Sequence, residues 1–176
     1  MIDIFYIETE RLLIRGFRRE DLDELFEIFG DGETMQFLEP PYDRDKTEKF
    51  LQEFCIDRKG ALAVSLAPSD RLIGYLLFNR CGSHNIYEMG WVFNKSFWGQ
   101  GYACEACSVV INYAFSELGA HKVFAETMDA VKSVPLMEKL GMKREGVQRE
   151  HVLSPDGKWR DMYLYGLLRE DFLREK

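Results

Sequence analysis

A short glycine-rich segment, Trp98-Gly99-Gln100-Gly101-Tyr102-Ala103, carries the clearest chemical signal in the sequence. It stands directly before the most regular helical pattern of the chain, an apolar stripe that runs from Ala103 to Leu118. Glycines at a helix start let backbone N–H groups converge on one point, where the helix dipole also favours negative charge. The segment therefore predicts an anion site suited to phosphate, with a plain glycine turn as the alternative. It lacks the lysine and Ser/Thr of a P-loop and the spacing of a dinucleotide fingerprint.

The cysteines raise a competing possibility of redox chemistry. Cys104 and Cys107 form a Cys-x-x-Cys near a helix N-terminus, a position that lowers the pKa of a thiol. In the redox fold that uses this motif, however, a cysteine opens the helix directly after a strand, and here the glycine segment occupies that place. A zinc site would need a second pair, which Cys55 and Cys81 do not form. We interpret Cys107 as a buried structural residue and keep a thiol oxidoreductase as a third class of function.

The surrounding pattern predicts an α/β chain with a mixed sheet. A strand–helix–strand unit over residues 86–127 implies a right-handed crossover between parallel strands. Ser154-Pro155-Asp156-Gly157 predicts a tight hairpin turn. The predicted strands are residues 9–17, 61–67, 71–80, 86–94, 121–127, 142–153 and 158–168. The predicted helices are residues 20–29, 32–38, 44–58, 103–118 and 134–140, the last with Ser133 as its cap.

Composition restricts the function further. The chain has 176 residues, 46% of them hydrophobic, which suits one domain with a packed core. Its net charge of −7 repels phosphate, so we expect no nucleic-acid partner, and it favours a cationic partner such as an amine. No apolar run reaches the roughly 18 residues of a membrane span, and residues 1–8 lack a signal peptide's basic start. We expect a cytoplasmic protein without membrane contact. His84, His121 and His151 fall in different elements and predict no metal site.

Five ordered segments resemble the RimJ/RimL-like subgroup of the GNAT N-acetyltransferases. In the glycine-rich segment, Gly101 and Ala103 match the last two positions of the family pattern (Gln/Arg)-x-x-Gly-x-(Gly/Ala). Trp98 stands where most members have Gln or Arg, a departure that the subgroup shares. The other four segments are residues 9–15, 88–93, 138–142 and 156–161. The resemblance spans about residues 8–168 and keeps the order of elements given above.

The resemblance implies a GNAT-like α/β (α+β) fold in a single domain over residues 1–176. The sheet would be mixed and mostly antiparallel, with about seven strands and helices on both faces. The implied activity is transfer of an acetyl group from acetyl-CoA to a primary amine by direct attack in a ternary complex. The acceptor is a protein N-terminus or a small amine, and no metal is required. A non-catalytic CoA-binding or regulatory domain is the alternative on the same fold. A homodimer is compatible with it, because an open edge strand invites pairing.

The resemblance also implies where acetyl-CoA binds. Val92 and Phe93 would pair with the pantetheine, and backbone N–H groups of the glycine-rich segment would hold the pyrophosphate. Those N–H groups belong to Gly99, Gln100, Gly101, Tyr102 and Ala103. Lys132 and Lys139 either reach the CoA phosphates or remain solvated. Tyr6, Phe37, Tyr42 and Trp159 either line an acceptor pocket or serve packing alone.

Acetyl transfer to an amine requires a base, a donor for the tetrahedral oxyanion and stabilisation of the leaving thiolate. Glu88 in the central strand is the candidate base, with a solvated or ion-paired glutamate as the alternative, and Glu150 is a lesser candidate. A strand backbone N–H would bind the oxyanion. Ser133 matches the serine of the subgroup's Asn-x-x-Ser segment and is either an acid toward the CoA sulfur or only a helix cap. Ala130 replaces the asparagine of that segment.

Overall fold

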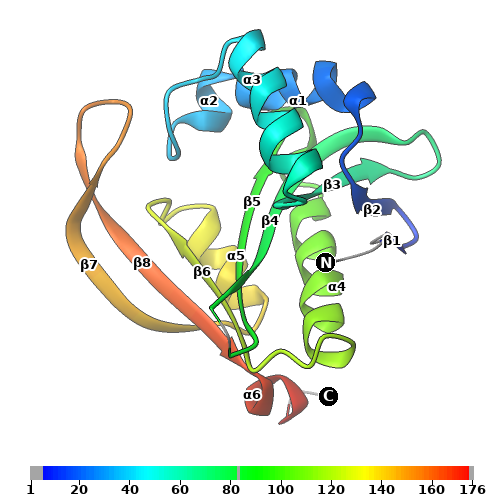
Figure 1. Ribbon diagram of the computed structural model, residues 1–176. Helices are drawn as coiled ribbons and strands as arrows, with labels where there is room; N and C mark the ends of the chain where they lie inside the picture. The colour runs from blue at the N-terminus through cyan, green and yellow to red at the C-terminus, as the bar shows by residue number, and fades with distance from the viewer. Residues whose placement is uncertain (1–5, 83, 175–176) are drawn as a thin grey trace.

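One mixed sheet of eight strands organises the molecule (Figure 1). The computed structural model describes residues 6–82 and 84–174, and the expectation for the first eight residues falls largely outside this range. The strand order is β1-β2-β3-β4-β5-β6-β8-β7, and every neighbouring pair is antiparallel except β5–β6. The strands are β1 Tyr6–Glu8, β2 Leu12–Gly16, β3 Ala61–Leu66, β4 Arg71–Cys81, β5 Ile86–Phe93, β6 Lys122–Thr127, β7 Lys143–Leu153 and β8 Trp159–Leu168.

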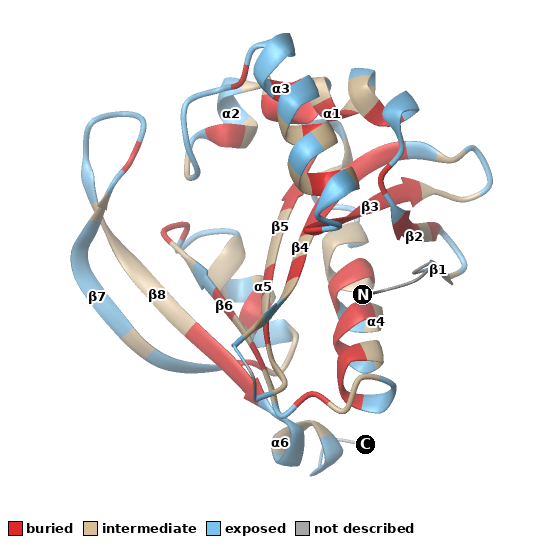
Figure 2. Ribbon diagram, viewed as in Figure 1, coloured by how far each residue is buried: buried red, intermediate tan, exposed pale blue. Residues whose placement is uncertain are grey.

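Helices cover both faces of the sheet, as expected. One core packs α4 and α5 against the sheet, and a second core packs α1 and α3 against the opposite face (Figure 2). Neighbouring residues of β3 divide between these cores, Leu62 and Val64 in the first and Ala61 and Ala63 in the second, because successive side chains of a strand alternate. The helices are α1 Leu22–Phe29, α2 Gly32–Met35, α3 Arg44–Phe50, α4 Tyr102–Ser116, α5 Ser133–Lys139 and α6 Arg169–Arg174. No helix in the described ranges is long and apolar enough to cross a membrane.

Several predicted elements differ from the structure. The sheet has eight strands rather than about seven, because the three residues of β1 pair with β2 at the edge. The predicted helix over 44–58 is α3 followed by a π-helical segment over Leu51–Asp57. The prediction that Ser133 caps the last predicted helix is wrong. Ser133 is the first residue of α5, and the Asp129 carboxylate instead accepts the backbone N–H groups of Val131 and Lys132 just before it.

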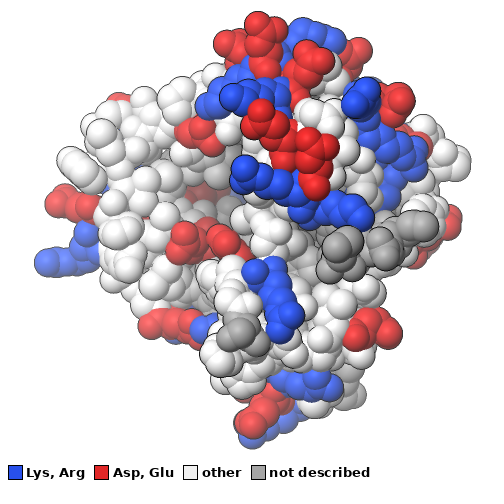
Figure 3. Space-filling model, in the orientation of Figure 1, with Lys and Arg blue, Asp and Glu red and all other residues white. Residues whose placement is uncertain are grey.

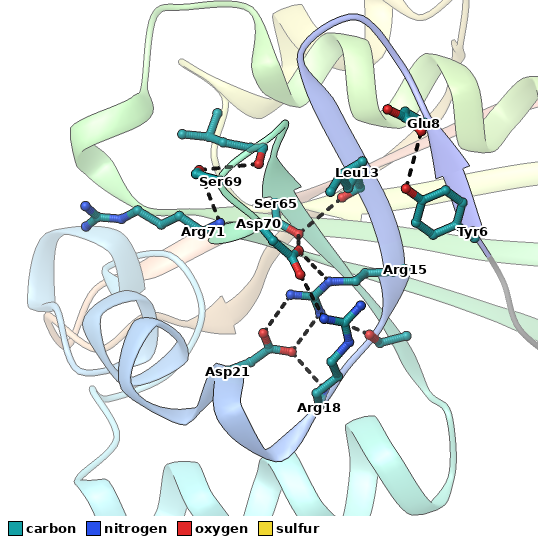
Figure 4. Close-up of polar contacts among 12 residues, drawn as sticks. Tyr6, Glu8, Leu13, Arg15, Arg18, Asp21, Ser65, Ser69, Asp70 and Arg71 are labelled. Carbon is teal, nitrogen blue, oxygen red and sulfur yellow. Dashed lines mark hydrogen bonds and ion pairs between the residues drawn. The ribbon is translucent and has the colours of Figure 1, made fainter.

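A buried ion-pair network fastens the α1–α3 layer to the sheet (Figure 4). Arg15 on β2 is 4% exposed and donates to both carboxylate oxygens of Asp21, at 2.8 and 2.9 Å. Its Nε donates to Asp70 in the β3–β4 turn at 2.8 Å, and Arg18 donates to the other oxygen of Asp70. The network joins β2, the turn that starts α1 and the β3–β4 turn. It therefore holds the start of α1 against the sheet.

Candidate active site

The candidate site lies where the two parallel strands of the sheet separate. β5 and β6 pair over three residues only, and the last pair is Glu88 with Phe124. Beyond it, β5 continues beside β4 to Phe93, and β6 continues beside β8 to Thr127. A cavity of about 430 Å³ opens here, lined by both diverging strands, the starts of α4 and α5, and the α2 region.

Backbone groups on one edge of β5 face this opening. The carbonyl of Asn85 accepts an N–H from the segment entering β6, so every second residue of β5 after Asn85 directs its backbone toward β6. Met89, Trp91 and Phe93 belong to this set and lie beyond the last β5–β6 pair. The Phe93 carbonyl accepts the Trp98 indole N–H at 2.8 Å. Met89 and Trp91 therefore present backbone donors and acceptors to the cavity.

The glycine-rich segment forms the opposite end of the cavity. Gly99 and Gly101 have φ angles of +73° and +82°, a left-handed conformation that glycine adopts without steric cost. Gly101 is the N-cap of α4, and the first helical bond runs from the Glu105 N–H to the Gly101 carbonyl at 3.0 Å. The N–H groups of Tyr102 and Ala103 precede that bond and have no partner within the helix. The local structure predicted for an anion site is present.

Two lysines line the cavity. Lys132 places its Nζ 3.6 Å from the ring centroid of Trp98, and Lys139 lines the cavity from the end of α5. Cations beside the free N–H groups of a helix start suit an anionic ligand. Trp98 thus binds the strand end through its N–H and the lysine through its ring.

Two carboxylates, one in the lining and one just outside it, lie along the diverging strands. Glu88 is half-buried, and its carboxylate lies 3.9 Å from the Cys81 sulfur. Burial raises the pKa of Glu88, and the negative charge of Glu126 on β6 raises it further. Glu126 lines the cavity, and Glu88 lies just before the point where the strands part. Figure 3 shows acidic side chains around a hollow between the α1–α3 layer and the β7–β8 hairpin.

The α2 region forms one wall of the cavity and is in contact with the β7–β8 hairpin. Phe37 and Leu38 line it just after α2. The guanidinium of Arg160 on β8 lies 5.0 Å from the centroid of the Phe37 ring, a cation–π contact. Ser154 and Asp156 in the hairpin turn hold that guanidinium through hydrogen bonds. The hairpin therefore meets the α2 region beside the cavity.

Most of the expected cofactor residues line this cavity. The lining residues among those expected for cofactor or catalysis are Val92, Phe93, Gly99, Gly101, Tyr102, Ala103, Lys132, Ser133 and Lys139. Gln100 and Glu88 are adjacent to lining residues but are not among them. The β4–β5 register directs the backbone of Val92 toward Tyr75 on β4, so Val92 lines the cavity with its side chain.

Other expected residues lie elsewhere. Glu150 sits on the exposed β7, where its φ of +46° marks an irregular stretch and its N–H donates to Asp161. Of the four candidate aromatics, Phe37 alone lines the cavity. Tyr42 is buried in the α1–α3 core, whereas Tyr6 and Trp159 are exposed.

The structure agrees with the interpretation of Cys107 as a buried structural residue. Cys107 is fully buried in the α4 core, and burial raises the pKa of its thiol, so it is not an activated nucleophile. All four cysteines are free. Within residues 6–82 and 84–174, no cluster of His, Cys, Asp and Glu could hold a metal ion.

Sequence reasoning missed Glu126, and of the α2 region it named only Phe37. Within β6, Val123 and Ala125 point into the α4 core, so alternation puts Phe124 and Glu126 on the other face. Glu88 shares that face, but only the β5–β6 register reveals that the two carboxylates are neighbours. The short α2 carries no periodic signal that would have linked its other lining residues to the site.

Comparisons with known proteins agree with this geometry. Residues 11–143 match the family model described as "Acetyltransferase (GNAT) domain". The chain is 32% identical to the uncharacterized N-acetyltransferase YnaD of Bacillus subtilis over 95% of this chain and 99% of that protein. A crystal structure of a GNAT-family acetyltransferase from Bacillus anthracis superposes with a TM-score of 0.87 at 30% identity, covering 94% of this chain and 99% of that chain. Spermidine N-acetyltransferase from Vibrio cholerae, solved with CoA and spermine, shares the fold, with a TM-score of 0.81 at 23% identity over 94% and 99% of the two chains.

Proposed function

The chain belongs to the GNAT acetyltransferase family, an acetyl-CoA-dependent class of acyltransferases, and from this premise we propose that it acetylates a cationic primary amine. The acceptor would enter between Glu126 and the α2 region. We further propose that residues 1–176 form one domain of this kind, since a single sheet extends from β1 to β8. The observation that carries the proposal is a cavity lined by the glycine-rich segment at the start of α4 and by Glu126, with Glu88 just outside its lining.

The residues present fit acetyl-CoA, which supplies a reactive acetyl thioester. We assign the pyrophosphate to the backbone N–H groups at the start of α4, with Lys132 and Lys139 adding positive charge. The assigned N–H groups are those of Gly99, Gln100, Gly101, Tyr102 and Ala103. The pantetheine would lie along the free edge of β5 from Trp91 to Phe93, where Val92 contributes its side chain.

The same strand edge suits the reacting carbonyl. Met89 and Trp91 direct backbone groups into the opening, and a preorganised N–H there would stabilise the oxyanion of the tetrahedral intermediate. Ser133 lines the cavity, and none of the described residues hydrogen-bonds to its hydroxyl. That hydroxyl would donate to the CoA sulfur as the thiolate leaves.

Glu88 is the proposed general base. An amine must lose a proton to attack, and a carboxylate whose pKa is raised toward neutral pH is a better base than an ordinary one. Burial and the charge of Glu126 act on the pKa of Glu88 in that direction. Because Glu88 lies just outside the lining of the cavity, the proton would pass to it through a bound water. Glu126 would attract the cationic amine and is the competing candidate for the base.

The acceptor class rests on charge. A half-buried and a cavity-lining carboxylate favour an amine that arrives as an ammonium ion, either a small amine or a protein N-terminus. The V. cholerae enzyme shares only the fold, but its bound spermine makes polyamines a rational part of an acceptor panel.

The test begins with binding and proceeds to turnover. Acetyl-CoA at about one hundred times its Kd should stabilise the protein by roughly 2.7 kcal/mol, which a thermal shift detects. Release of CoA, followed by chromatography, then screens polyamines, small monoamines and N-terminal peptides. Glu88→Gln should lower kcat by about a hundredfold or more while leaving acetyl-CoA affinity unchanged. Absence of a shift at saturating acetyl-CoA would refute the assigned site. Binding without turnover over the whole panel would favour the non-catalytic alternative.

A further inference from the structure

Arg11, in the turn between β1 and β2, reaches across to the start of α4. Its Nη1 donates to the Gln100 carbonyl at 3.0 Å, and its Nε donates to the Glu105 carboxylate at 2.7 Å. The guanidinium carbon also lies 4.5 Å from the centroid of the Tyr102 ring. One side chain thus contacts two residues of the proposed pyrophosphate loop and one residue of the first turn of α4, although it does not line the cavity itself.

Glu105 holds Arg11 in this position. The Thr9 hydroxyl donates to the second carboxylate oxygen of Glu105 at 2.6 Å, so both oxygens are bound. Partial burial alone would raise the pKa of Glu105, but the hydrogen bonds from Thr9 and Arg11 outweigh it and lower that pKa. The carboxylate is therefore ionised at neutral pH and paired with the guanidinium, and such charge-assisted bonds are the strong kind.

The bond to Gln100 determines which way the next N–H points. In a planar trans peptide the C=O and the following N–H point in opposite directions. Because Arg11 holds the Gln100 carbonyl, the Gly101 N–H is directed away from Arg11, and Gly101 lines the cavity. Gly101 forms one side of this peptide, and a glycine backbone rotates at little steric cost. Without Arg11, local sterics would hold this peptide only weakly in its orientation.

Charge gives Arg11 a second effect on the same loop. A carboxylate in the first turn of a helix stabilises the free N–H groups, but it also repels a phosphate that must bind there. Glu105 occupies that turn, 22% exposed in its side chain, and Arg11 neutralises it from 2.6 Å. The pair leaves the helix start net neutral in side-chain charge, so its N–H groups remain attractive to an anion.

We propose that Arg11 is a positioning residue for acetyl-CoA: it fixes the Gln100–Gly101 peptide and cancels the Glu105 charge, so that the loop accepts the pyrophosphate. The inference rests on the proposed function of the loop. The competing interpretation is a purely structural link between the β1–β2 turn and α4. That interpretation predicts lower stability and no selective effect on the donor.

The test compares two acetyl donors. Arg11→Ala should raise KM for acetyl-CoA about tenfold or more, the range for a lost hydrogen bond to a charged group, with kcat and acceptor KM little changed. With S-acetyl-pantetheine, which lacks the pyrophosphate, the variant and the wild type should have equal kcat/KM. Arg11→Lys keeps the charge but not the fork of N–H donors, and should recover only part of the affinity. Arg44→Ala is the control, because Arg44 forms an exposed ion pair with Asp23 away from the cavity.

A double variant separates the two effects of Arg11. If Glu105 repulsion alone caused the loss, Arg11→Ala/Glu105→Ala would regain wild-type KM; a persistent loss supports the role at the Gln100 carbonyl. Unchanged acetyl-CoA KM in Arg11→Ala, or an equal loss with acetyl-pantetheine, would overturn the inference. If Arg11→Ala fails to fold, the same two-donor comparison on Arg11→Lys decides between these outcomes. A wild-type protein that does not bind acetyl-CoA would refute the proposed function itself, and the inference with it.

Discussion

Replacing Gly101 by alanine tests the anion-binding loop through its backbone alone. A Cβ at this position would lie 3.6 Å from the Arg11 Nη2, an ordinary contact, so no clash is introduced. The φ of +82° is the obstacle, because a left-handed conformation costs a residue with a Cβ about 1–2 kcal/mol. The free loop would relax away from that conformation, and bound CoA would have to restore it. CoA affinity should therefore fall by about five- to thirtyfold, the factor that corresponds to this energy.

Gly157→Ala is the matched control for this substitution. Gly157 has a φ of +78° with nothing within 4 Å of the added Cβ, and it lies in the β7–β8 turn. Its strain should appear as a lower Tm, by about 2–4 °C per kcal/mol for a chain of this length, with CoA affinity unchanged. Calorimetric titration of CoA into both variants gives the two Kd values directly. Equal Kd values for wild type and Gly101→Ala, or an equal loss in both variants, would refute the assignment of the loop.

Three further predictions concern pH, stability and the thiols. Since Glu126 helps to raise the pKa of Glu88, the acid limb of the kcat/KM profile should lie above the usual carboxyl range and move to lower pH in Glu126→Gln. An acid limb that stays in place would contradict this coupling. Asp21→Asn removes the negative charge that pairs with Arg15, which is 4% exposed. The substitution should destabilise the fold by about 3 kcal/mol, the lower end for a broken buried pair, because Asp70 still pairs with Arg15. An unchanged Tm would contradict this prediction. Cys107→Ser buries a hydroxyl among apolar side chains and should cost about 1–3 kcal/mol in urea unfolding, with acetyl transfer retained below the new Tm. If the wild type reduced insulin and this variant did not, the oxidoreductase alternative would be supported instead.

Local features of the fold were predictable because their causes are local. The stripe from Ala103 to Leu118 anticipates α4, and Ser154–Gly157 anticipates the β7–β8 turn, since a few adjacent residues determine each. The glycine-rich segment belongs to the same class. Its left-handed glycines and free N–H groups follow from residues within one turn of each other.

Features that depend on register were not predictable in this way. Glu126 lies opposite the free end of β5 only because β6 pairs with β5 over residues 122–124. The bond between Arg11 and Gln100 spans 89 positions of sequence, and no periodicity links them. Ser133 illustrates a third case. A serine before a helical pattern suggests a cap, but the N-cap position of α5 is Lys132, and Asp129 accepts the two N–H groups just before the helix.

The narrow junction between β5 and β6 gives the enzyme a mechanical property. The sheet consists of two parts, β1–β5 and β6–β8–β7. They are joined by the three residue pairs between β5 and β6 and by the α4 core, which both parts contact. The anion-binding loop follows the first part, whereas Glu126 belongs to the second. Under the proposed assignments, bending at this short seam would change the distance between the donor's phosphates and the acceptor's ammonium, while each binding surface would keep its own shape. Under the same assignments, the pairs between residues 86–88 and 122–124 would set how the two substrates are aligned.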